Sequence, residues 1–341
     1  MSKKLVKPVL QYTLSLAVAI GILWYVLSQV ELEKMLGKLH LLNYWWIGAS
    51  VFFGLLSYLL RAYRWNLLLA PIGYRPGFVP TFLATMVGYL ANLLLPRFGE
   101  VVRCGMLKRS DAVPVSASLG TVLVDRAFDL LALLSIVGMA LFLEFDVLKD
   151  FLAQIFQGEG TDSSSQGFFF YYLLAGVVLV AGLLWVIYRL YRVQILQHAL
   201  YQKASGFVRE LLAGVMSVRK LESPVGFWLS TILIWVMYYL MSYLIVFSLP
   251  ATSDIDFIAG LSILAMGGIG MAAPVQGGLG TYHLLVSGVL MLYGAEENEA
   301  VLLAFVLHTS QTLLVIVVGS ISFLISMLRK KAQPITSSQH V

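Results

Sequence analysis

The sequence predicts an all-α polytopic membrane protein with about six full transmembrane helices and two shorter, broken segments. Hydrophobic residues make up 59% of the chain and charged residues only 12%, whereas about a quarter of a typical soluble domain is charged. The apolar residues fall in blocks close to the ~20 residues that cross a bilayer core. Lys and Arg gather in short loops beside these blocks, so the net charge of +5 indicates membrane topology and not nucleic-acid binding.

Six blocks are long enough to cross the membrane. They are residues 9–30, 44–64, 115–145, 168–188, 225–249 and 299–328. The first follows Lys3, Lys4 and Lys7, as a signal peptide would, but its apolar run is too long for one. We therefore interpret it as an uncleaved first helix.

Two further apolar segments are broken by proline. Residues 80–95 end at Pro96 and are followed by Arg97 and Arg103. A full crossing would place these arginines outside, against the positive-inside bias of every other basic loop. We therefore expect a re-entrant helix that enters from the cytoplasm and turns near Pro96. The second segment, 257–293, is broken at Pro274 and forms either a hairpin of two short helices or a re-entrant loop from outside.

The chain is expected to form one membrane domain over residues 1–331, with two repeats at about 9–145 and 168–328. Each repeat has two spans, a broken segment and a third span, so an odd number of crossings inverts the second repeat. Residues 189–223 are amphipathic and basic, which is typical of a cytoplasmic surface helix. Residues 332–341 are expected to be a disordered tail. Both termini are predicted to be cytoplasmic, in a bacterial inner membrane.

The third span carries Asp125, Arg126 and Asp129 at roughly 16 to 22 Å from its start, which is the membrane midplane. Charges at this depth are functional candidates by default. Asp125 and Asp129 share one helix face, and Arg126 is placed for an ion pair with Asp129.

Three interpretations of these charges remain open. They form a structural bridge to Arg64, Arg97 or Arg103; or they hold those arginines around a cavity, leaving one for an anionic headgroup; or a carboxylate couples transport to protons. The cavity interpretation also includes Glu100 beside Arg97 and Arg103.

Arg61 and Arg64 end the second predicted span, where arginines are often simple interface anchors; Arg64 is the stronger cavity candidate. The run containing Gly277, Gly278 and Gly280 has no charge and suits backbone amides that line a cavity. A helix starting near Gly280 would direct its positive end toward an anion. The alternative for this run is tight glycine-mediated helix packing.

No catalytic constellation is visible, since Gly-x-Ser-x-Gly, His-Glu-x-x-His and P-loop motifs are missing. His283 and His308 are interpreted as hydrogen-bonded core residues, and neither a metal site nor a cofactor is expected. The single cysteine, Cys104, excludes an intramolecular disulfide. We expect that the protein is not an enzyme.

Four motifs carry a family resemblance: Arg61-Ala-Tyr-Arg-Trp65, Asn92-Leu-Leu-Leu-Pro-Arg-Phe-Gly-Glu-Val-Val-Arg103, Asp125-Arg-Ala-Phe-Asp129 and Pro274-Val-Gln-Gly-Gly-Leu-Gly280. From Lys7 to about Lys331 the chain resembles the lysylphosphatidylglycerol synthase transmembrane region family, which are flippase-like integral membrane proteins. The resemblance implies a standalone member without the soluble aminoacyltransferase domain, so synthase activity is not implied. It also implies cavity residues at Arg64, Asn92, Arg97, Glu100, Arg103, Asp125 and Asp129.

The leading hypothesis is a flippase for a phospholipid or lipid-linked intermediate with an anionic or aminoacylated headgroup. One alternative is a membrane enzyme acting on a lipid-linked sugar or phosphate, with Glu100, Asp125 or Asp129 as acid or base. Another is a non-transporting membrane scaffold. The expected partner is the membrane lipid itself, and a homo-oligomer or a lipid-modifying enzyme as partner is left open.

Overall fold

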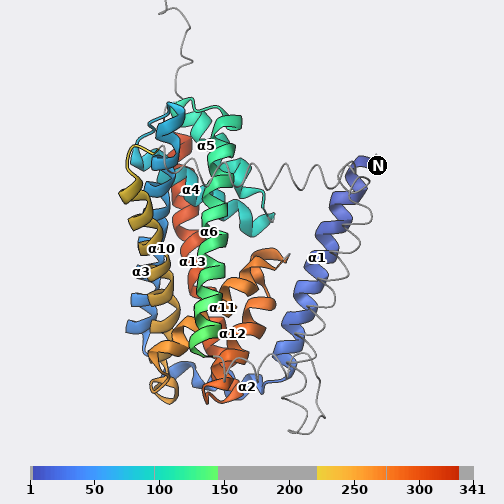
Figure 1. The fold of residues 1–341 in the computed structure, drawn as a ribbon. Coiled ribbons are helices and arrows are strands. Elements are labelled where there is room, and N and C mark those ends of the chain that lie inside the picture. Colours follow the sequence, from blue (N-terminus) through green and yellow to red (C-terminus); the bar gives the residue numbers. More distant parts are fainter. Residues whose placement is uncertain (1–2, 96, 145–220, 274, 330–341) are drawn as a thin grey trace, which may run out of the picture. The chain divides into compact units, whose positions relative to one another are not determined.

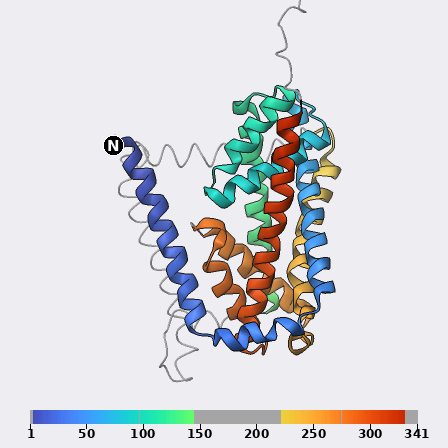
Figure 2. The ribbon, with the colours of Figure 1, turned by 180° about the vertical axis from the view of Figure 1, so that it is seen from behind.

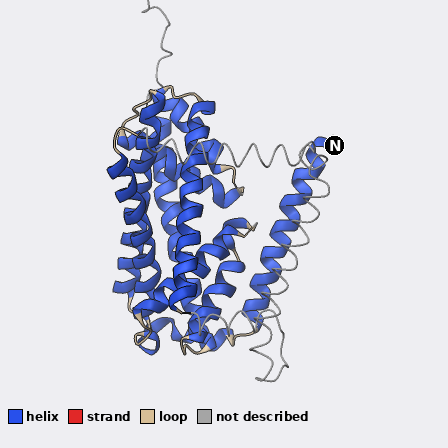
Figure 3. Cartoon of the chain, viewed as in Figure 1, coloured by secondary structure: helices blue, strands red, loops and turns tan. Residues whose placement is uncertain are grey.

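The computed structural model describes residues 3–95, 97–144, 221–273 and 275–329, and every regular element within these ranges is a helix (Figure 3). The α-helices are α1 (Lys3–Ser28), α2 (Leu32–Gly37), α3 (Tyr44–Leu69), α4 (Phe78–Leu94), α5 (Gly99–Asp111), α6 (Val115–Leu143), α10 (Pro224–Leu244), α11 (Phe257–Ala272), α12 (Thr281–Leu292) and α13 (Glu297–Leu328). Short 3-10 turns are η1 (Lys38–Leu41), η2 (Ala70–Ile72), η4 (Ile245–Ser248), η5 (Pro250–Thr252) and η6 (Gln276–Gly278). The predicted span 168–188, the amphipathic residues 189–220, the tail, and both prolines at the predicted breaks lie outside the described residues.

Four stretches of the described chain are long and apolar enough to cross a membrane: Tyr44–Ile72, Val115–Leu143, Pro224–Ser248 and Glu297–Leu328. They match four of the six predicted full spans. A fifth span is possible at Leu16–Ser28 with Leu32–Leu41, although these two helices are bent by 81°. The protein is thus a multi-pass helical membrane protein, with Phe78–Leu94 and Phe257–Ala272 as shorter apolar helices.

Several helix ends meet at one end of the bundle, here called the Arg75 face. Arg75 follows α3 and its Nη2 lies 2.6 Å from a carboxylate oxygen of Glu222, which precedes α10. Arg109 in the last turn of α5 donates to the carbonyl of Met327 in the last turn of α13, at 3.0 Å. Helices α3, α5 and α13 therefore end at this face, and α10 begins there.

The opposite end of the bundle is here called the Lys38 face. The Nζ of Lys38 lies 2.8 Å from Glu299 and 3.0 Å from Glu296 at the start of α13. The amide of Asn43, the N-cap of α3, donates to the carbonyl of Ser248 at the end of η4, at 2.7 Å. Helices α3 and α13 therefore begin where the stretch α10–η4 ends, which fixes the direction of three spans.

Two helical hairpins extend into the bundle from these opposite faces (Figures 1 and 2). The pair α4–α5 starts and ends at the Arg75 face, and the pair α11–α12 starts and ends at the Lys38 face. Their tips meet inside, where Leu93 in the last turn of α4 lies beside Gly277. The sequence prediction of a segment that turns back near Pro96 is confirmed in this geometry.

The α4–α5 hairpin is held together by a close backbone approach. A Cβ atom on Gly99 would lie 2.0 Å from the carbonyl oxygen of Gly88, so only glycine fits there. The side chain of Asn92 accepts a hydrogen bond from the amide of Gly99 at 2.7 Å, which satisfies a free donor at the start of α5. Arg97 in the turn has a φ of 63°, a left-handed conformation that is uncommon for a residue with a side chain.

An apolar core lies between α3, α4, α5 and α6, toward the Arg75 face. It consists of Trp65, Leu69, Ala84, Cys104, Leu107, Val113 and Val122. The indole Nε1 of Trp65 donates to the hydroxyl of Thr121 at 2.9 Å, so α3 and α6 are joined in a fixed register. This register brings the arginines of α3 level with the aspartates of α6.

Candidate functional site

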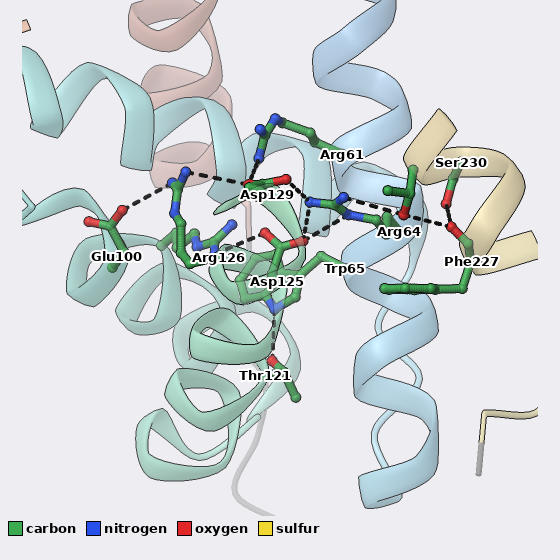
Figure 4. Close-up of polar contacts among 12 residues, drawn as sticks. Arg61, Arg64, Trp65, Glu100, Thr121, Asp125, Arg126, Asp129, Phe227 and Ser230 are labelled. Atoms are coloured by element: carbon green, nitrogen blue, oxygen red, sulfur yellow. Dashed lines mark hydrogen bonds and ion pairs between the residues drawn. The ribbon is translucent and has the colours of Figure 1, made fainter. Parts of the chain in front are cut away.

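Arg64 of α3 contacts both aspartates of α6 in the interior of the bundle. Its Nη2 lies 2.7 Å from Asp125 and 2.5 Å from Asp129. The side chain of Arg64 is 0% exposed and that of Asp125 only 1%. Buried charges persist only when they are paired and hydrogen-bonded, so these three residues form a single unit (Figure 4).

Arg61 joins the same unit from one turn earlier in α3. Its Nη1 lies 2.7 Å from Asp129, and its Nε donates to the hydroxyl of Tyr238 on α10. The interface-anchor interpretation is therefore wrong for Arg61, which is buried. The predicted span ended at Arg64, whereas α3 continues to Leu69. A hydropathy pattern ends a span at arginines, but here the aspartates of α6 neutralise them.

Arg103 reaches the unit from α5. Its Nη2 lies 3.5 Å from Asp125, and its guanidinium carbon lies 4.6 Å from the centre of the Trp65 ring. At 3.5 Å the ion pair is long, and the cation–π contact supplies part of the stabilisation of this buried charge.

Arg126 of α6 connects the unit to the start of α5. Its Nη2 lies 3.0 Å from Glu100 and its Nη1 lies 3.7 Å from Asp129. The intrahelical pair with Asp129 was predicted from the spacing and is confirmed. The connected groups comprise four arginines and three carboxylates, so the unit carries one positive charge in excess.

A narrow crevice with no room for a water molecule lies between the α4–α5 hairpin and α6. Its polar lining comes from Thr85, Tyr89, Asn92, Glu100, Arg103 and Arg126. Four of these side chains carry a buried atom without a hydrogen-bond partner among the described residues: the Tyr89 hydroxyl, Glu100 Oε2, Arg103 Nε and Arg126 Nε. Unpaired buried polar groups are costly, so their gathering in one crevice indicates a site for a polar ligand.

The structure brings together most of the predicted cavity residues. Asn92, Glu100 and Arg103 line the crevice, and Arg64, Asp125 and Asp129 form the ion-paired layer next to it. Arg97 is the exception, because it is exposed in the hairpin turn and lies outside this group of charges. The backbone of this residue is left-handed, and its side chain is exposed.

The second hairpin contributes glycines and no formal charge. Helix α12 begins at Thr281 with Gly280 as its N-cap, as the sequence predicted. Gly277, Gly278 and Gly280 have φ of 56°, 73° and 82°. A Cβ on Gly280 would lie 2.8 Å from the carbonyl oxygen of Ala19 in α1. These contacts match the packing alternative for this run, and its role toward a ligand stays a prediction.

Two histidines hold this glycine turn against α13. The Nε2 of His308 donates to the carbonyl of Gly277 at 2.8 Å, and the amide of Gly280 donates to Nδ1 of His283 at 3.3 Å. Their interpretation as hydrogen-bonded core residues is confirmed. The two rings lie 4.7 Å apart, a pairing that their separation in the sequence gave no reason to expect.

A larger hollow of about 10 Å³ lies at the Arg75 face, between the ends of α4, α5 and α13. Arg109, Ser110 and Arg329 line it, without a carboxylate. None of its lining side chains is among the buried unpaired groups of the described residues. The smaller crevice is therefore the stronger candidate site.

Three residues of the site were not singled out from the sequence. Arg126 was noted only as a partner of Asp129, and Tyr89 and Tyr238 were not noted at all. Arg61 and Arg64 are three residues apart and lie on one helix face, and Asp125 and Asp129, four apart, do the same. These two spacings could have predicted that both arginines pair with both aspartates. The tyrosines had no comparable signal, since aromatic residues are common throughout this chain.

Comparison with known proteins supports the family resemblance. Residues 12–319 match the family model described as "Lysylphosphatidylglycerol synthase TM region". Among curated proteins, the chain is similar to Glycosyltransferase AglD of Haloferax volcanii, with 23% identity over 305 residues. The alignment covers 82% of this chain and 49% of that relative, so the chain spans about half of the relative's length. No solved structure matches.

Proposed function

Because the chain belongs to the lysylphosphatidylglycerol synthase TM region family, we propose that it moves a membrane lipid between the two leaflets of the cytoplasmic membrane. The headgroup binds in the crevice between the α4–α5 hairpin and α6, while the acyl chains stay in the bilayer. The observation that carries this proposal is the group of unpaired Arg103, Arg126 and Tyr89 donors beside an ion-paired layer that has excess positive charge.

The division of labour among the charges supports this proposal. Arg61 and Arg64 are fully engaged by Asp125 and Asp129, and they hold α3 on α6. Arg103 and Arg126 both line the crevice, and the Nε of each has no hydrogen-bond partner among the described residues. Guanidinium groups with free N–H donors match phosphate oxygens, so the inner pairs fix the geometry and the outer arginines bind.

The crevice has no room for a water molecule, whereas typical ligand sites enclose roughly 300 to 1,000 Å³. Binding a headgroup therefore requires the α4–α5 hairpin to move away from α6. The pair between Glu100 and Arg126, at 3.0 Å, is the contact that such a movement breaks, and the side chain of Arg126 is 37% exposed. The described conformation is thus the closed state of the proposed transport cycle.

We further propose the inverted-repeat topology that the sequence predicts, with both termini and the Arg75 face in the cytoplasm. The packing supports it through an exchange of contacts between the halves: α4 packs on α13, and α11 packs on α6. If a rotation relates the two halves, α4 corresponds to α11 and α6 corresponds to α13. The contact of α4 with α13 then has its counterpart in the contact of α11 with α6. Hairpins that enter from opposite faces are a recurring arrangement in transporters.

An enzymatic role on lipid-linked substrates is the second candidate, and the printed name of the relative, a glycosyltransferase, is the observation in its favour. The aligned region covers only 49% of that relative. Asp125 and Asp129 are both paired with arginines in the interior of the bundle, and neither lines the crevice. We therefore propose transport without chemical change of the lipid.

The test is lipid exchange across proteoliposomes that contain the purified protein and a fluorescent phospholipid. We expect exchange by the natural chain and its loss in Arg126→Gln and Arg103→Ala. Arg109→Gln is the matched control, because Arg109 lies at the Arg75 face and outside the crevice. Unchanged exchange in both crevice variants would reject the site. Mass spectrometry of the recovered lipid separates transport from an enzymatic reaction, since only an enzyme changes the lipid's mass.

A further inference from the structure

The chain between α1 and α3 has a surface that the proposed function does not use. It consists of α2 (Leu32–Gly37) and η1 (Lys38–Leu41), here called the α2–η1 segment. We infer that this segment is an amphipathic helical segment that lies in the plane of the membrane at the Lys38 face, with a row of leucines inserted among the lipids of that leaflet. Helix α1 then crosses the bilayer alone. The inference does not depend on the proposed function.

The first step is the length and direction of the helices on the two sides of the bend. Helix α1 has 26 residues, which is about 39 Å at 1.5 Å per residue and more than the ~30 Å of a hydrocarbon core. It therefore needs no continuation to complete a span. The α2–η1 segment is bent by 81° from α1, so it advances only about 3 Å along the axis of α1. Both ribbon views show α2 lying across the Lys38 end of the bundle (Figures 1 and 2).

The second step is the distribution of side chains around the segment. Leu32, Leu36 and Leu39 are spaced four and three residues apart, so they share one face, and they are between 37% and 55% exposed. Met35, on the adjoining face, is buried. Glu33, on the remaining face, is exposed. A helix that lies in the membrane plane beside a bundle needs these three faces, one toward the protein, one toward the acyl chains and one toward water.

The third step is the attachment of the segment to the bundle. The Nζ of Lys38 lies 2.8 Å from Glu299 and 3.0 Å from Glu296, at the start of α13. The backbone amide of Glu31, just before α2, donates to the side chain of Asn298 at 3.2 Å. Two points of the segment are thus fixed to α13, and with these contacts in place the leucine face remains exposed.

The fourth step identifies what covers the leucine face. The aromatic residues that flank the segment in the chain are also exposed: Trp24 in the last turns of α1, and Tyr44 and Trp45 at the start of α3. Trp and Tyr are enriched where a membrane meets water. The leucines therefore continue the lipid-facing surface of the spans to the level of the headgroups. The bilayer is the occupant that this continuity supports.

The charges of the segment indicate which property of the bilayer it recognises. Lys34 pairs with Glu31 at 2.7 Å, and Lys38 pairs with two glutamates of α13. Both lysines of the segment are therefore engaged by carboxylates. Interfacial helices that select anionic lipids do so with basic residues on the polar face. Here the contact rests on burial of the leucines, so its depth should not depend on the charge of the lipids.

The experiment measures the depth of nitroxide spin labels on the full chain in phosphatidylcholine nanodiscs. The labelled variants are Leu36→Cys and Leu39→Cys on the leucine face, and Glu33→Cys is the matched control on the polar face. The natural chain, whose Cys104 is buried, gives the background. On the leucine face we expect collisions with oxygen, which concentrates among acyl chains, to exceed those with a water-soluble nickel chelate several-fold. The order should be reversed at Glu33→Cys.

Each other pattern of accessibility would overturn the inference. Access of the nickel chelate to all three labels would place the segment in water. Preference for oxygen at all three would make the segment part of a membrane-crossing helix. Protection of the leucine-face labels from both reagents would show that protein, such as a second copy of this chain, covers that face. Adding phosphatidylglycerol to the nanodiscs should leave the depth unchanged, and insertion only in its presence would reject recognition by apolar burial.

Discussion

The two helical hairpins have the same shape and opposite chemistry. The α4–α5 hairpin carries charged side chains, and Glu100 and Arg103 of α5 each have a buried polar atom without a partner among the described residues. The α11–α12 hairpin carries no charge at its tip, and its turn is closed by its own backbone and by His283 and His308. Among the buried side chains that the structure describes, those of the first hairpin leave polar atoms without a hydrogen-bond partner and those of the second hairpin do not.

This difference assigns different tasks to the two halves of the protein. In the proposed function the side chains of the first hairpin bind the headgroup, because the Tyr89 hydroxyl and Arg103 Nε have no hydrogen-bond partner among the described residues. The second hairpin packs against the first, since Gly277 lies beside Leu93, and the Gly277 carbonyl is bonded to His308. Changes in the first hairpin should therefore affect binding, and changes in the second should affect stability.

The largest effect is expected when the ion-paired layer behind the first hairpin is broken. Arg64→Met leaves Asp125 and Asp129 buried with part of their pairing lost, and breaking such a pair costs about 3–5 kcal/mol. The measurement is the melting temperature of the detergent-purified protein. Arg75→Met, which removes an exposed pair, is the control and should change it little. Similar shifts in the two variants would show that the buried layer contributes no special stability.

A second large effect is expected at the crossing of α4 and α5. Gly99→Ala places a Cβ 2.0 Å from the carbonyl oxygen of Gly88, so the hairpin must open, at a cost of about 1–3 kcal/mol or more. Gly105→Ala in the same helix meets nothing within 4 Å and should stabilise α5 by about 0.5–1 kcal/mol. Opposite signs of the shift in melting temperature are thus expected from the same chemical change. A tolerated Gly99→Ala would contradict the close crossing.

A smaller effect is expected in the second hairpin, and it should concern stability alone. His308→Phe keeps an aromatic ring beside Tyr282 but leaves the Gly277 carbonyl without its donor, at a cost of about 1–3 kcal/mol. Melting should occur at lower temperature, while the relative binding of anionic and cationic lipids should be unchanged. A change in lipid preference would place the second hairpin in the binding site and remove the distinction between the two.

The smallest loss of stability is expected when the ion pairs at the Lys38 face are removed. This loss is the reference against which the loss of the buried pairs is compared. Hydrogen bonding to Glu299 raises the pKa of Lys38 above its ordinary value of 10.5. A raised pKa means that the contribution to stability is present at neutral pH and is lost as the pH rises through the pKa of the folded state. Lys38→Met should cost less than about 1 kcal/mol, and this cost should disappear in strongly alkaline buffer. A loss that persists there would point to packing and not to charge.

The helices and their directions could largely be predicted from the sequence. Apolar blocks near membrane-spanning length predicted four of the spans in the described residues, and the position of Arg97 and Arg103 after a short block predicted that α4 and α5 turn back together. These predictions succeeded because hydrocarbon thickness and loop charge act on each segment separately. No knowledge of the neighbouring helices was needed.

The composition of the site could be predicted only in part. Asp125 and Asp129 stood out because charges are rare at this depth, but the sequence could not say which arginines they meet. The structure pairs them with Arg61 and Arg64, and it leaves Arg97 exposed. That choice depends on the register between α3 and α6, which is set by contacts such as Trp65 with Thr121 and not by any local pattern.

By itself the sequence determined that this is a multi-pass helical membrane protein that resembles the lysylphosphatidylglycerol synthase TM region family, with charges within a predicted span and two segments broken by proline. The tertiary structure alone decided which charges are satisfied, which polar atoms remain free, and that two histidines far apart in the chain close one glycine turn. The physical reason is that the two kinds of property depend on different distances along the chain. Hydrophobic length and charge bias are properties of a single segment, whereas hydrogen bonding in a bilayer interior is decided by which side chain of another helix lies within about 3 Å.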